Sequence, residues 1–517
     1  MKITFISLFF TLYFFCSNGQ NTFQHLYSAA LQTQFIDAAP TSDSGYIVCG
    51  LVGSISTDYL ITKINENGDV EWAKHVGSWV GNEIAYKVGE VAGSGYYILG
   101  TTNSFSFNAQ INLIRFDESG NIIWNKIYSG GEYTSTPSIR TTTSGGFIIS
   151  ATLTDNTGNY FFLIKIDASG NTIWSNGYGT NYLKYTCRDV DVCTDGGCIA
   201  VGDDFVSGIV IYKTDVNGNL NWSKKYSSGY TYTAALSVAA ISDLGYIISG
   251  VLDDGGVYYL MLMEIDVGGN FLWGRKYNLP NNYYAFGSYS VHETPDGGFI
   301  MNSLFNNLNN VFPGITKVNS IGKFEWSKYY TVSNIFYSFP LSVKLTGDGG
   351  YVVSTGGYDL TSNVVGNLIK TDSLGETNCS VLQDSLADSP ITMYVTTLST
   401  SFPIGESNSI SFTSDDIPIL VSSNCSTNVA VSELHTEESG IAIFPNPTAD
   451  YFMVSNLDAR TSDITITDVV GKKIFVAAVN KQNEISIDAS AWTDGMYYVN
   501  VNAEGEVIQS KKILCIK

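Results

Sequence analysis

Large aromatic side chains recur in the segments that follow six tryptophan-bearing stretches of the sequence. Tyrosine and tryptophan rings have flat apolar faces and polar rims, which suit contact with sugar rings or with a protein partner. If these segments lie on one face of the fold, their rings form a shared binding surface. The alternative is that each ring only caps the core between neighbouring sheets. The predicted ligand-binding residues are Trp79, Tyr133, Tyr182, Tyr185, Tyr230, Tyr232, Tyr283, Tyr284 and Tyr337.

Histidine patterns give no sign of enzymatic chemistry. His25, His75, His292 and His435 are scattered, without the HExxH spacing of a zinc site. The sequence has no G-x-S-x-G nucleophile elbow either. We therefore predict no catalytic residue, no metal and no cofactor. The alternative is an extracellular polysaccharide-degrading hydrolase or lyase whose carboxylates come together from distant loops.

Acidic turns such as DESGN, DASGN and DVNGN offer oxygen atoms of the kind that bind calcium. They lack the D-x-[DN]-x-[DN]-G spacing and the distal glutamate of a calcium loop. A hairpin turn with glycine in the left-handed conformation accounts for their repetition. We therefore interpret them as structural turns.

Seven cysteines remain if the first 20 residues are removed, and an export route crosses an oxidising compartment. Cys193 and Cys198 flank a TDGG turn, so we predict that they face each other across a hairpin. Buried free thiols are the alternative for this pair. Cys379 and Cys425 bracket a segment outside the repeats and form a second predicted disulfide.

The chain is strongly acidic, since 27 Lys+Arg against 48 Asp+Glu give a net charge of −21. Such a chain is repelled by nucleic acid phosphates and by anionic lipid. Only 15% of the residues are charged, whereas glycine and tyrosine are abundant, which is typical of a sheet protein with many turns. We expect no nucleic-acid partner.

The first 20 residues are typical of a secretory signal peptide. Lys2 precedes an apolar run that reaches Phe15, and small and polar residues follow up to a predicted cleavage near Gly19 or Gln20. Phe14 and Phe15 stand where a lipoprotein signal needs small residues, which argues against lipidation of Cys16. No later stretch approaches the roughly 20 apolar residues that span a bilayer. An exported protein without a transmembrane segment is expected.

An internal repeat organises residues 21–379. A glycine-apolar stretch such as GYYILG, an apolar stretch such as INLIRF, a turn and a tryptophan recur seven times, with Cys379 in the last tryptophan position. The six tryptophans are 48 to 53 residues apart: Trp72, Trp124, Trp174, Trp222, Trp273 and Trp326. About 50 residues and four strands per repeat are typical of a propeller blade.

Ring closure is predicted from the two ends of the repeat region. Residues 22–28 are similar to a tryptophan-bearing fourth strand, and the seventh repeat has a poor fourth strand of its own. We therefore expect residues 22–28 to supply the outer strand of the seventh blade, which covers an edge that would otherwise invite aggregation.

These motifs carry a family resemblance over residues 22–379. The D-x-x-G-x-x-x-W pattern at Asp117, Gly120 and Trp124, which returns 50 residues later, resembles the tryptophan-docking repeat of quinoprotein-like propellers. The DGG turn resembles kelch repeats. The whole resembles the DGGY-repeat β-propellers of secreted Bacteroidota proteins. The adjacent cysteines of quinone-dependent dehydrogenases are absent, so the resemblance does not extend to their cofactor.

The C-terminal segment has a different pattern. Residues 380–439 form a polar connector with some strand character, and residues 440–517 alternate as in a small β-sandwich. The FPNPT sequence that begins at Phe444, the DGMY sequence that begins at Asp494 and the basic-apolar ending resemble the type A sorting domain of the type IX secretion system. That resemblance implies recognition by the type IX machinery, passage across the outer membrane, and either release or attachment to the surface.

The predicted fold is all-β: a signal peptide (1–20), a seven-bladed β-propeller (21–379), a connector (380–439) and an Ig-like sorting domain (440–517). The predicted function is a noncatalytic binding or adhesion module for an extracellular polysaccharide or surface protein. The alternative is the extracellular polysaccharide-degrading hydrolase or lyase, with its site on the channel face of the propeller, and a purely architectural surface coat is a third possibility.

Overall fold

A computed structural model describes residues 20–423 and 442–515, with gaps in both ranges. The omitted positions are 30–31, 54–55, 78–80, 106–107, 130–132, 157, 180–183, 205–207, 242–244, 279–287, 308–309, 332–334, 360–363, 380, 385, 387, 399–400, 404–405, 410–412, 418, 445–447, 449, 456, 458–462, 469–471, 480–481, 494 and 504–505. Of the predicted signal peptide, only Gln20 is described. The chain divides into two compact units, residues 1–426 and residues 427–517.

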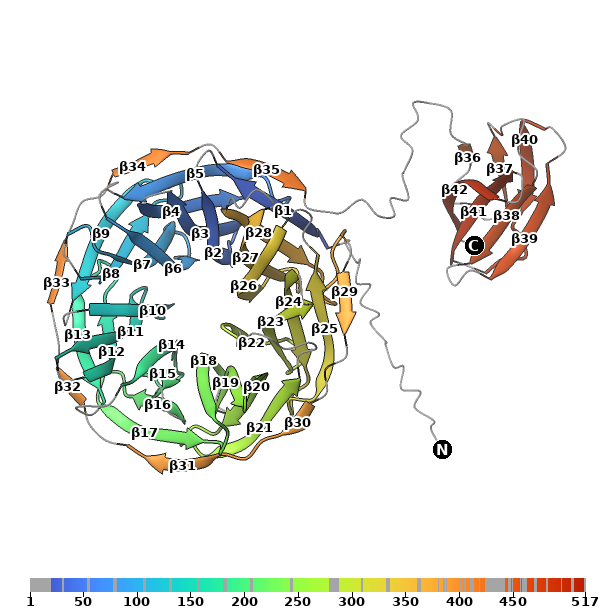
Figure 1. Cartoon of the computed structure of the whole chain (residues 1–517). Coiled ribbons are helices and arrows are strands. Elements are labelled where there is room, and N and C mark those ends of the chain that lie inside the picture. Colours follow the sequence, from blue (N-terminus) through green and yellow to red (C-terminus); the bar gives the residue numbers. More distant parts are fainter. Residues whose placement is uncertain are drawn as a thin grey trace, which may run out of the picture. The chain divides into compact units, whose positions relative to one another are not determined.

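All regular structure in the described residues is β-strand, and no helix long enough to span a bilayer is found there. In the first unit, antiparallel strands are arranged radially around a central axis (Figure 1). The described strands form five five-stranded sheets and one ten-stranded sheet. The ten-stranded sheet consists of two five-strand groups joined by one parallel pair, Val311 with Tyr337. We number the resulting groups sheets 1 to 7 along the chain.

Four strands of each sheet follow one another from the axis to the rim. The innermost strands, in sheet order, are β2 (Thr33–Pro40), β6 (Glu83–Glu90), β10 (Tyr133–Thr141), β14 (Thr186–Val192), β18 (Tyr232–Ile241), β22 (Val291–Glu293) and β26 (Ile335–Leu345). The second strands are β3 (Tyr46–Gly53), β7 (Tyr96–Thr102), β11 (Phe147–Asp155), β15 (Cys198–Asp203), β19 (Gly245–Asp254), β23 (Phe299–Asn307) and β27 (Tyr351–Asp359). The third strands are β4 (Thr57–Ile64), β8 (Gln110–Phe116), β12 (Gly158–Ile166), β16 (Gly208–Thr214), β20 (Val257–Ile265), β24 (Asn310–Val318) and β28 (Val364–Thr371). The fourth strands are β5 (Val70–Gly77), β9 (Ile122–Ser129), β13 (Thr172–Tyr178), β17 (Leu220–Ser227), β21 (Phe271–Asn278), β25 (Phe324–Tyr330) and, in sheet 7, β1 (Phe23–Ser28).

The pairing of β1 with β28 confirms the prediction that residues 22–28 supply a strand to the last sheet of the repeat region. The register places Phe23 opposite Lys370 and Tyr27 opposite Gly366. The first strand of the ring therefore completes the last sheet, and the two ends of the repeat region are held together by backbone hydrogen bonds.

Neighbouring sheets are joined by a repeated contact between a tryptophan and a turn glycine. Gly120 has a positive φ of 77° in the turn of sheet 2, and a Cβ there would lie less than 3.0 Å from the Trp72 ring of sheet 1. The same arrangement recurs around the ring, so glycine is needed both for the turn and for the close approach of the indole. The corresponding pairs are Trp124 with Gly170, Trp174 with Gly218, Trp222 with Gly269, Trp273 with Gly322, and Trp326 with Gly375.

Buried tyrosines reinforce these joints. In each of six cases a tyrosine hydroxyl donates a hydrogen bond to the backbone carbonyl of the turn glycine in the next sheet. The bonds are Tyr27–Gly68 (2.8 Å), Tyr128–Gly170 (2.8 Å), Tyr178–Gly218 (2.6 Å), Tyr226–Gly269 (2.7 Å), Tyr277–Gly322 (2.6 Å) and Tyr330–Gly375 (3.0 Å). A phenol buried with its hydroxyl paired contributes apolar area without an unsatisfied polar group.

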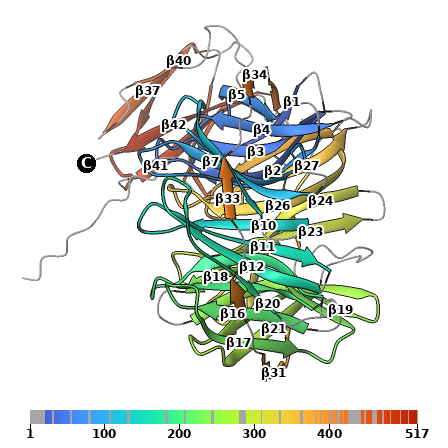
Figure 2. The same ribbon diagram turned by 90° about the vertical axis from the view of Figure 1, so that its left-hand side faces the viewer.

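A belt of seven short strands surrounds the ring, and it is formed by residues 381–423 of the predicted connector. Each belt strand pairs antiparallel with the fourth strand of one sheet, and the order runs backwards around the ring (Figure 1). The strands are β29 (Val381–Asp384), β30 (Asp388–Pro390), β31 (Tyr394–Thr397), β32 (Ser401–Pro403), β33 (Glu406–Ser409), β34 (Thr413–Asp416) and β35 (Leu420–Ser423), on sheets 6, 5, 4, 3, 2, 1 and 7 respectively. The edge-on view shows β33 lying across the outer side of the ring (Figure 2).

Apolar residues of the belt extend into the core between sheets. Leu386, Ile391 and Met393 are 5–7% exposed, and each belongs to a core cluster shared by two neighbouring sheets. Ile391 packs so closely on Gly274 that a Cβ at that glycine would lie 2.7 Å from its side chain. The belt therefore both covers the sheet edges and closes the core from outside.

The second unit consists of two small antiparallel sheets, a three-stranded one and a four-stranded one. Their inner faces share one core that includes Phe452, Ile464 and Val499. The strands are β36 (Ala442–Phe444), β37 (Tyr451–Ser455), β38 (Asp463–Asp468), β39 (Lys473–Ala478), β40 (Glu484–Asp488), β41 (Gly495–Ala503) and β42 (Glu506–Cys515).

Candidate functional site

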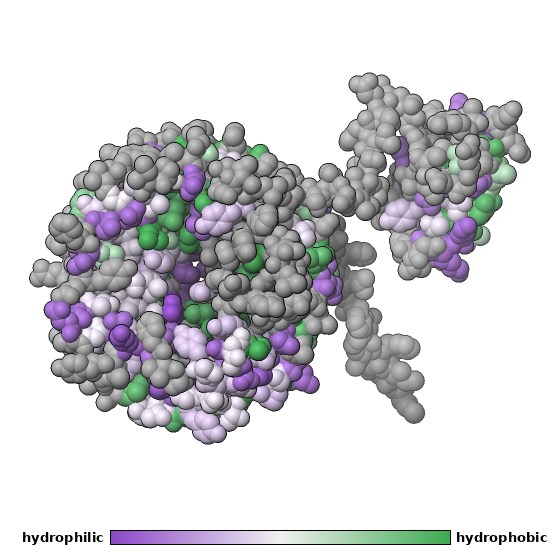
Figure 3. Space-filling view, in the orientation of Figure 1, coloured by the Kyte–Doolittle hydropathy of each residue, from purple (hydrophilic) through white to green (hydrophobic). Residues whose placement is uncertain are grey.

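Polar and charged side chains gather where the innermost strands meet the axis. Six of these strands carry a register shift relative to the second strand, at which a β-bulge re-aims the side chains that follow. The first residues after the shift are Asp37, Lys87, Ser138, Asp189, Ser237 and Ser342; two positions further on lie Arg140, Asp191 and Lys344. Hydrophilic residues are visible in the hollow at the middle of the ring (Figure 3). We call Asp37, Lys87, Arg140, Asp189, Asp191, His292 and Lys344 the axis cluster.

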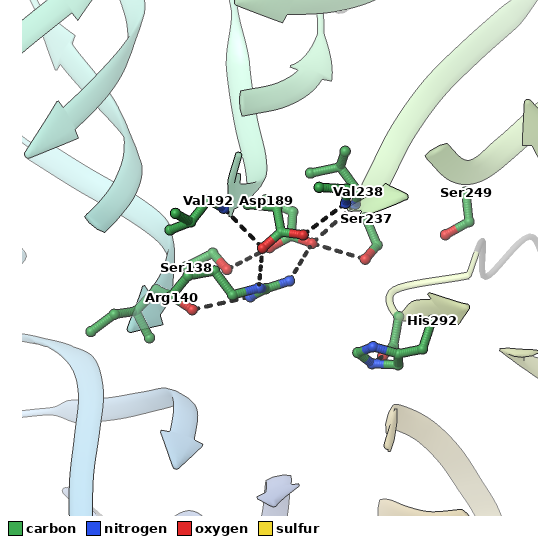
Figure 4. Close-up of polar contacts among 12 residues, drawn as sticks. Ser138, Arg140, Asp189, Val192, Ser237, Val238, Ser249 and His292 are labelled. Atoms are coloured by element: carbon green, nitrogen blue, oxygen red, sulfur yellow. Dashed lines mark hydrogen bonds and ion pairs between the residues drawn. The ribbon is translucent and has the colours of Figure 1, made fainter. Parts of the chain in front are cut away.

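Asp189 is the most highly connected member of the axis cluster (Figure 4). It is 3% exposed and links three sheets. Oδ1 accepts a hydrogen bond from Ser138 Oγ at 2.6 Å, while Oδ2 accepts bonds from Ser237 Oγ at 2.8 Å and from the Val238 backbone N–H at 3.1 Å. Burial alone would raise the pKa of Asp189, but Arg140, Lys87 and these donors lower it to about 2. Asp189 is therefore ionised at every physiological pH.

Arg140 joins the two aspartates of β14. Its Nη2 lies 3.2 Å from Asp189 Oδ2, and its Nε lies 3.3 Å from Asp191 Oδ1. Asp191 Oδ2 also accepts the Ala240 backbone N–H at 2.8 Å. Burial raises the pKa of Asp191, and Arg140 opposes that rise. The guanidinium is thus held in a fixed orientation by two carboxylates.

Asp37 repeats part of this geometry between sheets 1 and 2. Its Oδ2 accepts the Val88 backbone N–H at 3.1 Å, as Asp189 accepts that of Val238. Two aspartates at equivalent bulges therefore bind the innermost strand of the following sheet.

The innermost strands of sheets 6 and 7 carry His292 and Lys344. His292 Nε2 lies 3.2 Å from Ser290 Oγ, which itself donates to the Val343 carbonyl. Burial, and then the positive charges of Lys344 and Arg140, lower the pKa of His292 to about 3. The imidazole is therefore neutral in the pH range in which a free histidine would titrate.

Asp189 and His292 are suited to binding polar groups and poorly suited to proton transfer. Three cations face three carboxylates, Asp189 stays ionised, and His292 stays neutral. A general acid or base needs a pKa near the working pH, which neither residue has. Among the described residues no group of three His, Cys, Asp or Glu side chains could hold a metal ion.

Most of the predicted aromatic ligand contacts cannot be placed. Trp79, Tyr182, Tyr283 and Tyr284 lie outside the described residues. Tyr133 and Tyr337 lie in β10 and β26, where only the strand itself is described.

Three of the predicted aromatic residues can be placed. Tyr185 is 2% exposed and packs in the core between sheets 3 and 4, which is the alternative that the sequence left open. Tyr230 and Tyr232 are partly buried. The Tyr230 ring lies 4.9 Å from Lys276 Nζ, and Tyr232 begins β18, at the opposite end of the strand from Ala239 and Ala240. Tyr232 therefore lies at the other end of β18 from Ala240, whose backbone N–H bonds Asp191, and Tyr230 lies just before the strand begins.

The predicted Cys193–Cys198 disulfide is wrong, because both thiols are free and buried. Val192, not Cys193, stands opposite Cys198 in the hairpin. Paired residues share a face of the sheet, whereas adjacent residues point to opposite faces, so Cys193 lies on the other face from Val192 and Cys198. Cys193 packs between sheets 4 and 5, and Cys198 packs between sheets 3 and 4. Cys379 is disulfide-bonded, while its predicted partner Cys425 lies outside the described residues.

A second group of ionisable residues is buried between sheets 1 and 2. Glu83 and Asp58 are both 0% exposed, and His75 Nδ1 lies 3.6 Å from Asp58 Oδ2. Glu83 accepts hydrogen bonds from Thr102 Oγ1 at 2.8 Å and from Ser104 Oγ. Burial, together with the neighbouring Asp58, raises the pKa of Glu83 to about 7. Glu83 therefore carries its proton in acid and loses it near neutrality.

Glu83 is expected to make the ring less stable as the pH rises. Because its pKa is raised on folding, the stability it contributes is fully present below about pH 4.5 and is lost as the pH rises towards 7. The thermal midpoint of the wild-type protein should fall by a few degrees more between pH 5 and 8 than that of Glu83→Gln. Calorimetry at both pH values measures the difference, and equal pH dependence in the two proteins would exclude the effect.

The axis cluster was missed at the sequence level. Its members lie about 50 residues apart on different repeats, so no local spacing joins them. The usable signal was a charged residue inside an innermost strand, as at Asp37, Asp189 and Lys344.

Comparison with known proteins identifies the second unit. Residues 442–517 match the family described as the secretion system C-terminal sorting domain, which confirms the sorting domain predicted for residues 440–517. The protein is therefore secreted by the type IX system and reaches the cell surface or is released. No curated protein matches the sequence.

Solved structures give only distant similarity. A crystal structure of a protein of unknown function from Bacteroides caccae is 11% identical, with a TM-score of 0.36, and the match covers 60% of this chain and 94% of that one. The extracellular domain of a putative one-component system from B. thetaiotaomicron is 12% identical, with a TM-score of 0.21, and the match covers 93% of this chain and 80% of that one.

Proposed function

We propose that this protein is an exported, noncatalytic binding or adhesion module whose ligand, an extracellular polysaccharide or surface protein, is held at the axis of a seven-bladed β-propeller. The observation that carries the proposal is the axis cluster. Asp189 is ionised and hydrogen-bonded, His292 is neutral, and the three aspartates and Arg140 are fixed by contacts between sheets. Preorganised polar groups of this kind favour recognition without turnover.

The propeller assignment rests on the repeated four-strand sheets around one axis and on the pairing of β1 with β28. Radial repetition leaves short sheet edges, which the belt strands cover. The DGGY-type repeat and the tryptophan-to-glycine contacts support the same assignment. For the second unit we propose a type A, Ig-like sorting domain, and for Cys379 a disulfide with Cys425.

The function is tested with the secreted protein on an array of extracellular polysaccharides and surface proteins, followed by mass analysis of any bound glycan. We expect binding with recovery of the glycan at its original mass. Shortened or unsaturated products would favour the hydrolase or lyase, and absence of binding to every probe would leave an architectural role.

A further inference from the structure

Lys87 and Lys344, the two lysines of the axis cluster, lack the carboxylate partner that the buried lysines of the ring have. Lys87 lies on β6 and Lys344 on β26, so they approach the axis from the sheets on either side of sheet 1. Both side chains are partly exposed. The two residues are therefore only partly enclosed by the ring.

Buried lysines elsewhere in the ring have a carboxylate partner. Lys63, Lys213 and Lys370 lie 2.6–2.8 Å from an aspartate, and Lys317 and Lys328 are paired in the same way. Within the part of the chain that the structure describes, the side chains of Lys87 and Lys344 have neither an ion pair nor a hydrogen bond. An ammonium group has three donors and loses free energy when they are left unsatisfied away from water.

Neighbouring charges increase this demand for an acceptor. Lys344 has a lowered pKa, because of burial and because Lys87 and Arg140 repel its charge, although Asp37 and Asp189 oppose the effect. Asp189 is already bonded to Arg140, two serines and a backbone N–H, and Asp37 to the Val88 N–H. Asp37 Oδ1 has no hydrogen-bond partner, but each of the two ammonium groups has three donors, so donors remain at the axis even if this acceptor is used.

The residues around these donors favour a hydroxylated ligand over a protein segment. The bulge positions and those two residues further on carry charged, hydroxyl or small side chains. Protein partners usually require a large apolar or aromatic anchor at the centre of the contact, which these positions lack. The net charge of −21 repels anions at long range, but salt at physiological strength screens that repulsion beyond about 8 Å.

We propose that Lys87 and Lys344 together bind an oxyanion group, carboxylate or sulfate, of an acidic polysaccharide. This inference rests on the proposed binding function and names the ligand class of the same site. Each ammonium donates to one oxygen of the anion, and Arg140 stays bound to Asp189 and Asp191 as a fixed positive neighbour. Charge-assisted bonds of this type are about twice as strong as neutral ones.

The test is titration calorimetry of the full-length protein with three probes: oligogalacturonate, a sulfated galactan oligosaccharide and a neutral galactan oligosaccharide. The variant is K87Q/K344Q, and the matched control K184Q/K323Q removes two exposed ammonium groups. We expect at least one acidic probe to bind the wild type about tenfold or more tightly than the neutral one. K87Q/K344Q should lose that preference, and K184Q/K323Q should keep it.

Thermal melting provides the second measurement. Because the two ammonium groups repel each other and form no ion pair or hydrogen bond, K87Q/K344Q should melt at or above the wild-type temperature. A clearly lower midpoint would show that the lysines hold the fold together and would overturn the proposal. Equal affinity of the wild type and K87Q/K344Q for the acidic probes would also overturn it while leaving the binding function intact, whereas failure to bind any glycan would overturn both.

Discussion

Deletion of residues 442–517 should abolish secretion and leave the protein in the periplasm. These residues match the sorting-domain family, and they fold as a separate unit with its own core, so their removal takes away the export signal without opening the ring. Immunoblots of periplasm, outer membrane and medium measure the distribution. We expect a loss of at least about tenfold in the surface and medium fractions together.

The matched control transfers residues 427–517 to a periplasmic reporter protein. If the second unit is sufficient for recognition, the reporter should appear outside the cell. Recovery of the truncated protein in the medium or on the surface would contradict the assignment of residues 442–517 as the export signal.

Truncation of the buried belt residues should strongly destabilise the ring. Leu386, Ile391 and Met393 fill the core between sheets from the rim, and each large-to-alanine change at such a site costs about 2–5 kcal/mol. L386A/I391A/M393A should therefore lower the free energy of unfolding by roughly 6 kcal/mol or more, if the three effects add. Denaturant unfolding of the full-length variant gives the value.

The chain offers a matched control on the same belt. Leu382, Val395 and Val421 are 38–41% exposed, so L382A/V395A/V421A removes similar side chains from the solvent side. This control should change stability by less than about 1.5 kcal/mol in total. Equal losses in the two triple variants would mean that the belt does not seal the core.

Sequence periodicity was sufficient to predict the repeated sheets and the closing strand. The repeat places Trp124 and Gly120 in fixed phase, and the fourth-strand pattern returns in residues 22–28, because each repeat must make the same contact with its neighbour. The belt could not be predicted in this way. Its strands are three or four residues long, so an alternation such as that of Ile391 and Met393 ends after a few residues and does not show which sheet the strand joins.

Aromatic residues show why the candidate site was predicted less well than the fold. Tyrosine is expected on a ligand-binding surface because its ring has a polar rim. Tyr178 and Tyr226 are nevertheless fully buried, and their hydroxyls donate hydrogen bonds to turn glycines of the next sheet. The cysteine pair failed for a similar reason, because proximity in a hairpin does not decide which face a side chain occupies. The axis cluster depends on contacts between repeats, such as Ser138 with Asp189, that no single repeat contains.

The central claim is that the protein binds its ligand at the axis without altering it. Hydrogen–deuterium exchange of the full-length protein, with and without the tightest-binding array glycan, tests this most directly when the glycan mass is measured in the same samples. We expect slower exchange in peptides that cover β6, β10, β14 and β26, no change in the belt, and an intact glycan. Protection confined to the belt or to residues 442–515, or a shortened glycan, would contradict it.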